Sequence, residues 1–123
     1  MYPMDKLETI FTMQQALDDD IVKLRQLDYP TDVWMQREVL AMISELSEVL
    51  DEVNFKWWKN PRPIDSDALK NELVDVLHFF VSMCLKSGMN ADELYARYCE
   101  KNRENFDRQH GRSQKPGYEA GRE

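Results

Sequence analysis

Two pairs of acidic residues lie within apolar stretches that have helical spacing. The first pair is Glu45-x-x-Glu48 and the second is Glu72-x-x-Asp75. Because three residues span slightly less than one helical turn, both members of a pair project from the same side of a helix. Two such helices side by side would bring four carboxylates to one point. An unpaired carboxylate among apolar groups is costly, so this arrangement requires cations.

The predicted ligand atoms are all oxygens, which indicates a hard metal ion. Mg²⁺ prefers oxygen ligands and commonly bridges carboxylates to substrate phosphates, so we expect Mg²⁺, or Mn²⁺ in its place, ahead of zinc. The alternative is a purely structural ion network, for which Lys70, Lys101 and Arg108 are candidate partners.

A di-iron site is a further alternative, because Asp75-x-x-His78 resembles the carboxylate-x-x-His element of di-iron helical bundles. A complete site needs two such elements, and the only other histidine of the chain is His110. We therefore expect His78 to be a packed or hydrogen-bonding side chain.

The positions of the apolar residues predict an all-α fold, a bundle of four to five helices without strands. We expect one domain at residues 1–110 and a flexible polar tail at 111–123. The apolar flanks of the acidic pairs indicate that the two helices carrying them are largely buried. The predicted helices run from near Asp5 to before Tyr29, from a Thr31 cap to about Val53, from residues 65–67 to Lys86 with a Gly88 cap, and onward from an Asn90 capping box.

Two further segments combine residues that suit a nucleotide. The connector at residues 55–63 joins large aromatic side chains to cations, and two prolines keep it out of a helix. After residue 90, Lys101, Asn105 and Arg108 follow one another at helical spacing. Cations facing a metal cluster would form a slot for a polyphosphate, and the aromatic connector would form a wall for a base. An exposed polar face and ordinary aromatic packing are the alternatives.

Composition excludes several classes of protein. A net charge of −7 argues against binding a nucleic acid polymer, which requires a basic surface. No stretch is apolar and long enough to span a membrane. The two cysteines, Cys84 and Cys99, have neither zinc nor disulfide spacing, which favours a reduced, cytoplasmic setting. A chain of 123 residues with long amphipathic helices is expected to complete its core by pairing with a second copy, as a homodimer or tetramer.

In this order the segments resemble the all-α nucleoside triphosphate pyrophosphohydrolases, the group that contains MazG and the dimeric dUTPases. Its signature is two Glu-x-x-Glu/Asp elements on successive helices. Further stretches resemble the dimeric dUTPase branch and together cover roughly residues 10–118. They are Gln14-x-x-Leu17-Asp18-x-x-Ile21, Phe55-Lys56-Trp57-Trp58, Asp75-x-Leu77-His78-Phe79 and Tyr98-x-x-Lys101-Asn102-x-x-Asn105-x-x-Arg108-Gln109.

The resemblance implies a Mg²⁺ site at the four carboxylates, which would also be the catalytic residues, and release of pyrophosphate from a deoxynucleoside triphosphate. By position, the phosphate contacts would be Lys56, Lys101, Asn105 and Arg108. The base contacts would be Gln14, Phe55, Trp57, Trp58 and Phe79.

The first expectation is conversion of dUTP to dUMP and pyrophosphate, with Glu48 or Glu45 accepting a proton from the attacking water. Trp57-Trp58-Lys59 stands where this branch has aromatic-Trp-Ser. A dCTP-directed or broad-specificity house-cleaning pyrophosphatase is therefore the alternative within the same class. The alternative from another class is an acidic helical interaction module that anchors a partner protein through Trp57 and Trp58.

Overall fold

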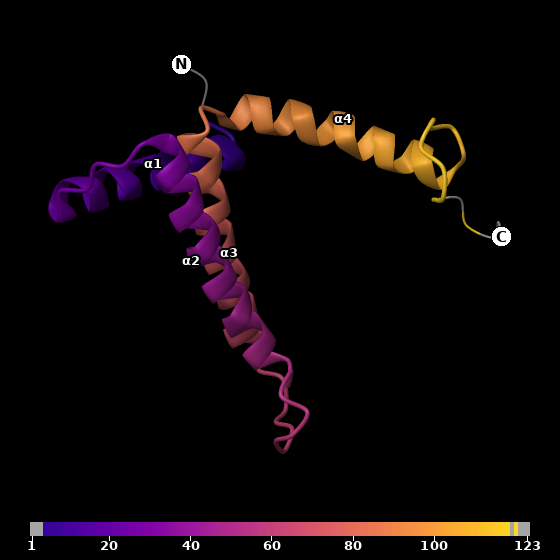
Figure 1. Ribbon diagram of the computed structural model, residues 1–123, viewed down its shortest axis with the longest axis horizontal. Coiled ribbons are helices and arrows are strands. Elements are labelled where there is room, and N and C mark those ends of the chain that lie inside the picture. Colours follow the sequence, from indigo (N-terminus) through magenta and orange to yellow (C-terminus); the bar gives the residue numbers. More distant parts are fainter. Residues whose placement is uncertain (1–3, 119, 121–123) are drawn as a thin grey trace. The chain divides into compact units, whose positions relative to one another are not determined.

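The computed structural model describes residues 4–118 and 120, and within them the fold is all-α (Figure 1). Its helices are α1 (Lys6–Arg25), α2 (Thr31–Glu52), α3 (Ser66–Lys86) and α4 (Ala91–Gln109). The predicted fold class is confirmed. The described residues form two compact units with the boundary between Met89 and Asn90, so α1 to α3 and α4 are treated separately below.

Short polar side chains determine where three of the helices begin. Asp5, Asp65 and Asn90 each accept a hydrogen bond from a backbone N–H in the first turn, which satisfies a donor that the helix leaves unpaired. The predicted Thr31 cap is wrong, because α2 begins at Thr31 itself and Pro30 precedes it without a side-chain bond. The fixed φ of proline gives the extended backbone needed there. Gly88 has φ +86°, as expected after the end of α3.

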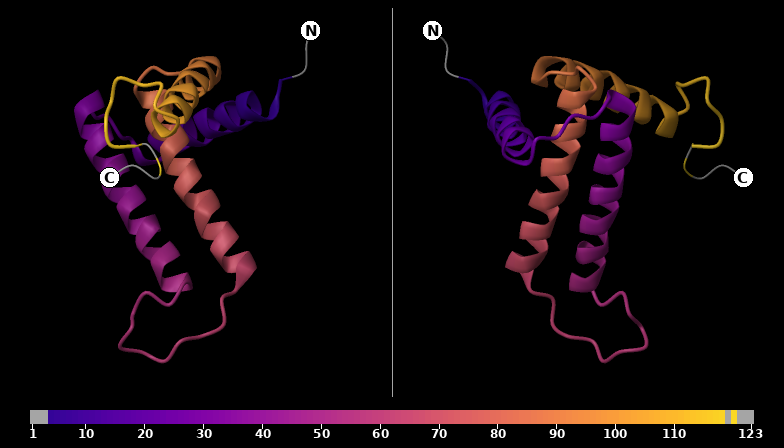
Figure 2. Two further views of the ribbon diagram at one scale, coloured as in Figure 1. Left: turned by 90° about the vertical axis from the view of Figure 1, so that its right-hand side faces the viewer. Right: turned by 60° about the vertical axis from the view of Figure 1, so that its left-hand side comes forward.

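The helices α2 and α3 form an antiparallel hairpin, and the segment between them closes one end (Figures 1 and 2). Asn54 has φ 58°, a left-handed conformation that asparagine tolerates well. Its amide donates to the carbonyl of Arg62 and its carbonyl accepts from the Arg62 N–H, both at 2.8 Å. This pair of bonds ties the start of the connector to its far side and limits how α3 can slide along α2.

Helix α1 crosses the hairpin at the end away from the connector (Figures 1 and 2). Phe11, Val81 and Cys84 are buried here, but so are the polar side chains Gln14 and Asp18. The prediction that α2 and α3 are largely buried is wrong for the single chain, because each covers the other along one side only. Exposed apolar residues include Ile43, Leu46 and Leu50 of α2 and Leu73, Val74, Leu77 and Phe80 of α3.

The second unit consists of α4 and the residues that follow it. Ser113 donates to the Glu104 carboxylate at 2.6 Å, and Arg112 Nε lies 3.0 Å from Asp107, so the described start of the predicted tail contacts the end of α4. Residues 119 and 121–123 of that tail lie outside the described residues, and the boundary at residue 110 stays a prediction. No helix in the described part of the chain is long and apolar enough to cross a membrane.

The role of side-chain caps in fixing the helix ends can be tested at the start of α3. Asp65→Ala removes the acceptor for the Ala68 N–H, so we expect unfolding in urea to become easier by about 1 kcal/mol. Asp67→Ala is the matched control, because Asp67 lies in the same turn without capping it and should cost only a few tenths of that. Equal losses would show that charge near the helix terminus, rather than the cap, stabilises this end.

Candidate active site

The four acidic residues predicted to meet do so across the seam between α2 and α3. One carboxylate oxygen from each of Glu45, Glu48, Glu72 and Asp75 can be chosen so that all of them lie within 4.8 Å of one another. We call this set the carboxylate quartet. The two pairs come from neighbouring antiparallel helices, and the i, i+3 spacing directs each pair toward the other helix.

Crowding of like charges changes how the quartet binds protons. The pKa of Glu72 is raised to about 7, first by a hydrogen bond with Glu48, then by burial and by the charges of Glu48, Asp75 and Glu45. The pKa of Glu45 is also raised, chiefly by burial and then by Glu48 and Asp75. Near neutral pH a fraction of the metal-free molecules therefore carries a proton on Glu72, which lowers the repulsion.

Two oxygens of the quartet are buried without a hydrogen-bond donor among the described residues, namely Oε2 of Glu45 and Oε2 of Glu72. Within residues 4–89 no lysine or arginine forms an ion pair with any of the four carboxylates. The alternative of a structural ion network predicted Lys70 as the partner in this unit, and that prediction is wrong. Orphaned carboxylate oxygens and an all-oxygen donor set fit Mg²⁺ or Mn²⁺.

His78 is a hydrogen-bonding side chain, as predicted, and it is outside the quartet. Its Nδ1 lies 2.6 Å from Gln14 Oε1, while Gln14 Nε2 donates to the Asp18 carboxylate at 2.9 Å. A carboxylate only accepts, which fixes the amide orientation and makes His78 Nδ1 the donor. The di-iron alternative finds no second histidine in this unit, since His110 belongs to the other.

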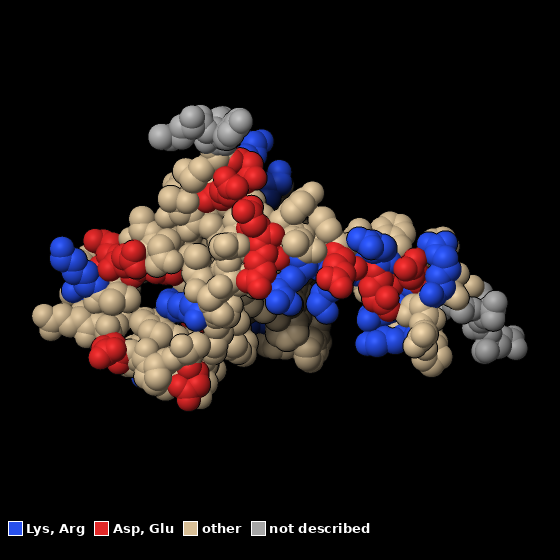
Figure 3. All heavy atoms as spheres, turned by 90° about the horizontal axis from the view of Figure 1, so that it is seen from above, with Lys and Arg blue, Asp and Glu red and all other residues tan. Residues whose placement is uncertain are grey.

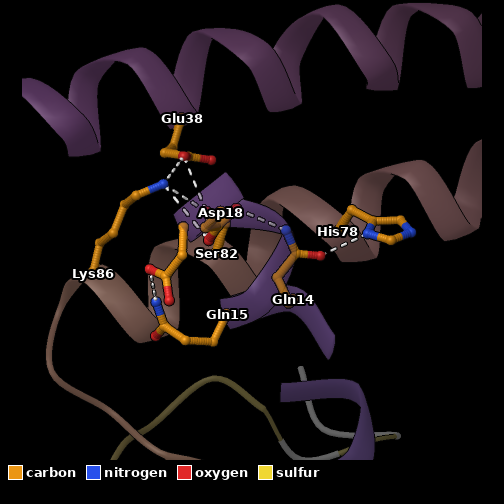
Figure 4. A network of polar contacts seen from close by, with 8 residues as sticks. Gln14, Gln15, Asp18, Glu38, His78, Ser82 and Lys86 are labelled. Carbon is orange, nitrogen blue, oxygen red and sulfur yellow. Dashed lines mark hydrogen bonds and ion pairs between the residues drawn. The ribbon is translucent and has the colours of Figure 1, made fainter. Parts of the chain in front are cut away.

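A buried ionic network continues from Gln14 across all three helices (Figure 4). Ser82 Oγ donates to Asp18 Oδ2 at 2.7 Å. Lys86 Nζ donates to Glu38 Oε1 at 2.6 Å and to Ser82 Oγ at 2.8 Å. The ammonium also lies 3.7 Å from Asp18. Two carboxylates share one lysine here, so the network carries a net negative charge.

A pocket of about 580 Å³ connects this network to the quartet, a size typical of small-molecule sites. Glu45 and Asp75 contribute to its wall, as do Gln14 and Phe79, so the structure brings two of the predicted base contacts to members of the quartet. Sequence reasoning assigned no function to the remaining polar and aromatic lining. Those residues are Asp18, Trp34, Arg37, Glu38, His78, Ser82 and Lys86.

The other predicted base contacts are not brought to this pocket in the single chain. Phe55, Trp57 and Trp58 pack edge to face on one another, with ring centroids 4.6 to 6.3 Å apart. They lie in the connector and remain exposed, Trp57 by 79%. Lys56, a predicted phosphate contact, is 3.9 Å from Asp51 and borders a separate polar hollow of the connector. In the single chain these three aromatic rings therefore contact one another and not the pocket beside the quartet.

The predicted phosphate stripe lies on α4, in the second unit. Arg108 donates to Glu104 at 3.1 Å and to Asn105 at 3.3 Å. The Ser113 hydroxyl and Arg108 hold the pKa of Glu104 below its usual value. Over α4, on the face shown in Figure 3, Lys and Arg side chains alternate with Asp and Glu side chains. The phosphate roles of Lys101, Asn105 and Arg108 stay predictions.

Two helices with acidic pairs that face each other across a shared seam match what the resemblance to the all-α nucleoside triphosphate pyrophosphohydrolases implies. The family model described as dUTPase matches residues 6–88, more than half of the chain. The protein belongs to this dUTPase family, as the resemblance predicted. The matched range contains α1, α2, α3 and the whole carboxylate quartet.

Relatives with curated names come from bacteriophages. The chain is 36% identical over 87 residues to the dCTP pyrophosphatase of Enterobacteria phage T4, covering 59% of this chain and 51% of that protein. It is 34% identical over 74 residues to the dCTP pyrophosphatase of Enterobacteria phage LZ5, covering 60% and 43%. The chain thus spans about half the length of these relatives. No solved structure matches it significantly.

The crowding of the quartet predicts an unusual pH dependence of stability without metal. Protonation of Glu72 favours the folded state, because its pKa rises from an ordinary 4.5 to about 7 on folding. This stabilisation is complete below the unfolded value and is lost as pH rises through the folded one. We expect the Tm in chelator to fall between about pH 5 and about pH 8.

Glu72→Gln should flatten this slope, because the group that titrates is gone. Glu52→Gln is the control, because Glu52 lies on α2 outside the quartet. This variant should leave the pH dependence of the Tm unchanged. A wild-type Tm that rises over the same interval would contradict the assignment of a proton to Glu72.

Proposed function

We propose that the protein hydrolyses a pyrimidine deoxynucleoside triphosphate, dUTP or dCTP, to the monophosphate and pyrophosphate. The observation that carries this proposal is the carboxylate quartet at one side of a pocket large enough for a nucleoside. Membership of the dUTPase family supports dUTP as substrate. The names of the phage relatives, which are dCTP pyrophosphatases, support the alternative of dCTP.

Glu45, Glu48, Glu72 and Asp75 would hold Mg²⁺ or Mn²⁺, and their unpaired buried oxygens support this role. Bound metal would supply Lewis acidity and would neutralise charge on the phosphates. The protein's own contribution is proton transfer. Glu48 is the exposed member of the quartet, so a water molecule can reach it, which suits it to accept the proton of the attacking water. Glu45 is the other candidate for this base.

Further residues predicted from the sequence would bind the substrate. Gln14 and Phe79 line the pocket and would contact the nucleoside. Lys101, Asn105 and Arg108 of α4, together with Lys56, would contact the phosphates, and Phe55, Trp57 and Trp58 would enclose the base. These roles rest on the stretches that resemble the dimeric dUTPases and on the chemistry of the side chains.

The exposed apolar residues of α2 and α3 support a homodimer. Ile43, Leu46 and Leu77 are 40% exposed or more in the single chain, and each lies on a helix that forms the hairpin. Exposed apolar residues that gather on two packed helices are typical of an interface. A second copy would cover them and would complete the core.

The direct test is pyrophosphate release from dUTP, dCTP, dTTP and dATP, each with Mg²⁺ and with chelator. We expect metal-dependent release from dUTP, dCTP or both. Release from all four would indicate a broad-specificity sanitising enzyme. If none is hydrolysed by folded, metal-loaded protein, the proposal fails and an interaction module built on Trp57 and Trp58 is favoured.

Variants of the quartet separate catalysis from folding. Glu48→Gln and Asp75→Asn should each reduce kcat at least about 100-fold while the metal-free protein stays folded or gains stability, since one repulsive charge is removed. Glu52→Gln is the matched control and should retain activity, because Glu52 is outside the quartet. Full activity of Glu48→Gln or Asp75→Asn would contradict the assignment.

The dimer is tested by measuring the molar mass with light scattering coupled to size-exclusion chromatography. Wild type should have the mass of two chains, and Ile43→Glu should shift it toward one, because a charge would then be buried in the interface. Leu24→Glu places the same charge at an exposed residue near the end of α1 and should leave the dimer intact. A monomeric wild type would contradict the proposed assembly.

A further inference from the structure

Within the described residues, one buried oxygen of the network beside the pocket has no hydrogen-bond donor. Asp18 accepts at both oxygens, from Gln14 Nε2 and from Ser82 Oγ. Glu38 accepts at Oε1 from Lys86, while its Oε2 is buried without a donor among the described residues. Ser82 also lies 3.0 Å from Glu38 Oε1, but its single proton is directed to Asp18 at the shorter distance.

Glu38 is built into the wall of the pocket and is held there. Its side chain is only 9% exposed, and Lys86 fixes one of its oxygens. Figure 4 shows the second oxygen turned away from the Lys86 ammonium. Lys86 in turn stacks on the Trp34 ring, 4.1 Å from its centroid, and Trp34 also lines the pocket. An unpaired, shielded carboxylate oxygen at this place calls for a donor from a bound molecule.

The distance from the quartet suits a nucleoside. Glu38 and Glu45 lie on the same helix seven positions apart, which is two turns or roughly 10 Å of rise. A nucleotide whose phosphates meet the quartet would therefore place its sugar and base along the pocket toward Glu38. This step rests on the proposed function, because it uses the quartet as the phosphate end.

The unpaired oxygen of Glu38 distinguishes between bases. A carboxylate oxygen only accepts hydrogen bonds, so at this point of the pocket wall, which Arg37 also lines, Glu38 favours a ligand group that donates one. Cytosine presents an exocyclic amino group, a donor, where uracil presents a carbonyl oxygen, an acceptor. A carboxylate accepts from the first and repels the second. We propose that Glu38 determines base specificity, by accepting a hydrogen bond from the amino group of cytosine and disfavouring uracil.

Glu38→Gln tests this assignment. The amide can keep its carbonyl on Lys86 and present its NH₂ group at the position of Oε2, which changes an acceptor into a donor. The ratio of kcat/KM for dCTP to that for dUTP should fall at least about tenfold. Glu52→Gln is the matched control, because it makes the same change on the same helix outside the network and the pocket. It should leave the ratio unchanged.

Binding without metal or turnover gives a second measurement. In calorimetry with chelator, wild type should bind dCMP more tightly than dUMP, and Glu38→Gln should reduce or reverse that preference. If wild type hydrolyses nucleotides but Glu38→Gln leaves both the kinetic and the binding ratios unchanged, the inference is overturned while the proposed function stands. If no triphosphate is hydrolysed but the dCMP preference depends on Glu38, the proposed function fails and the base assignment survives.

The 3′-hydroxyl of the sugar is the competing donor. It would make Glu38→Gln equally harmful for dCTP and dUTP, and the 2′,3′-dideoxy form of CTP would then be a poor substrate for wild type. That pair of results would overturn the cytosine assignment and would place the sugar at Glu38.

Discussion

Mutual repulsion among four carboxylates at the seam of α2 and α3 is the constraint on which the rest of the structure depends. The hairpin must hold its two helices in one register, because a shift along either helix would separate the acidic pairs. The Asn54 clamp on Arg62 serves that register at the connector end. The cost of bringing the charges together is relieved by a proton on Glu72, whose pKa is raised to about 7, or by a cation in its place.

Helix α1 is attached to the hairpin chiefly by polar and ionic contacts. Few apolar side chains are fully buried where α1 crosses the hairpin, and the ionic network of Asp18, Glu38, Ser82 and Lys86 joins the three helices there. Such a network is directional, so it fixes how α1 is rotated as well as where it lies. As a result Gln14 is turned toward His78, beside the quartet. Stability and the shape of the pocket depend on the same contacts.

The sequence was informative wherever the relevant contacts are local. Caps at Asp5, Asp65 and Asn90 fix helix ends within a turn, and the spacing of the acidic pairs determines which side of each helix they occupy. Pairings such as Lys86 with Glu38 join residues 48 positions apart and leave no local pattern. No sequence pattern therefore distinguished Glu38 from the other acidic residues of α2. Likewise, apolar spacing identified the faces of α2 and α3 but could not say what covers them.

Because one network both docks α1 and lines the pocket, occupancy of the pocket and docking of α1 are thermodynamically linked. A molecule that touches Gln14, Glu38 and Lys86 at once bridges α1, α2 and α3 and favours the docked arrangement. Conversely, any fraction of molecules in which α1 has come away from the hairpin lowers the observed affinity by that fraction. Hydrogen exchange of the α1 amides would thus report ligand binding, although the carboxylate quartet lies on the other two helices.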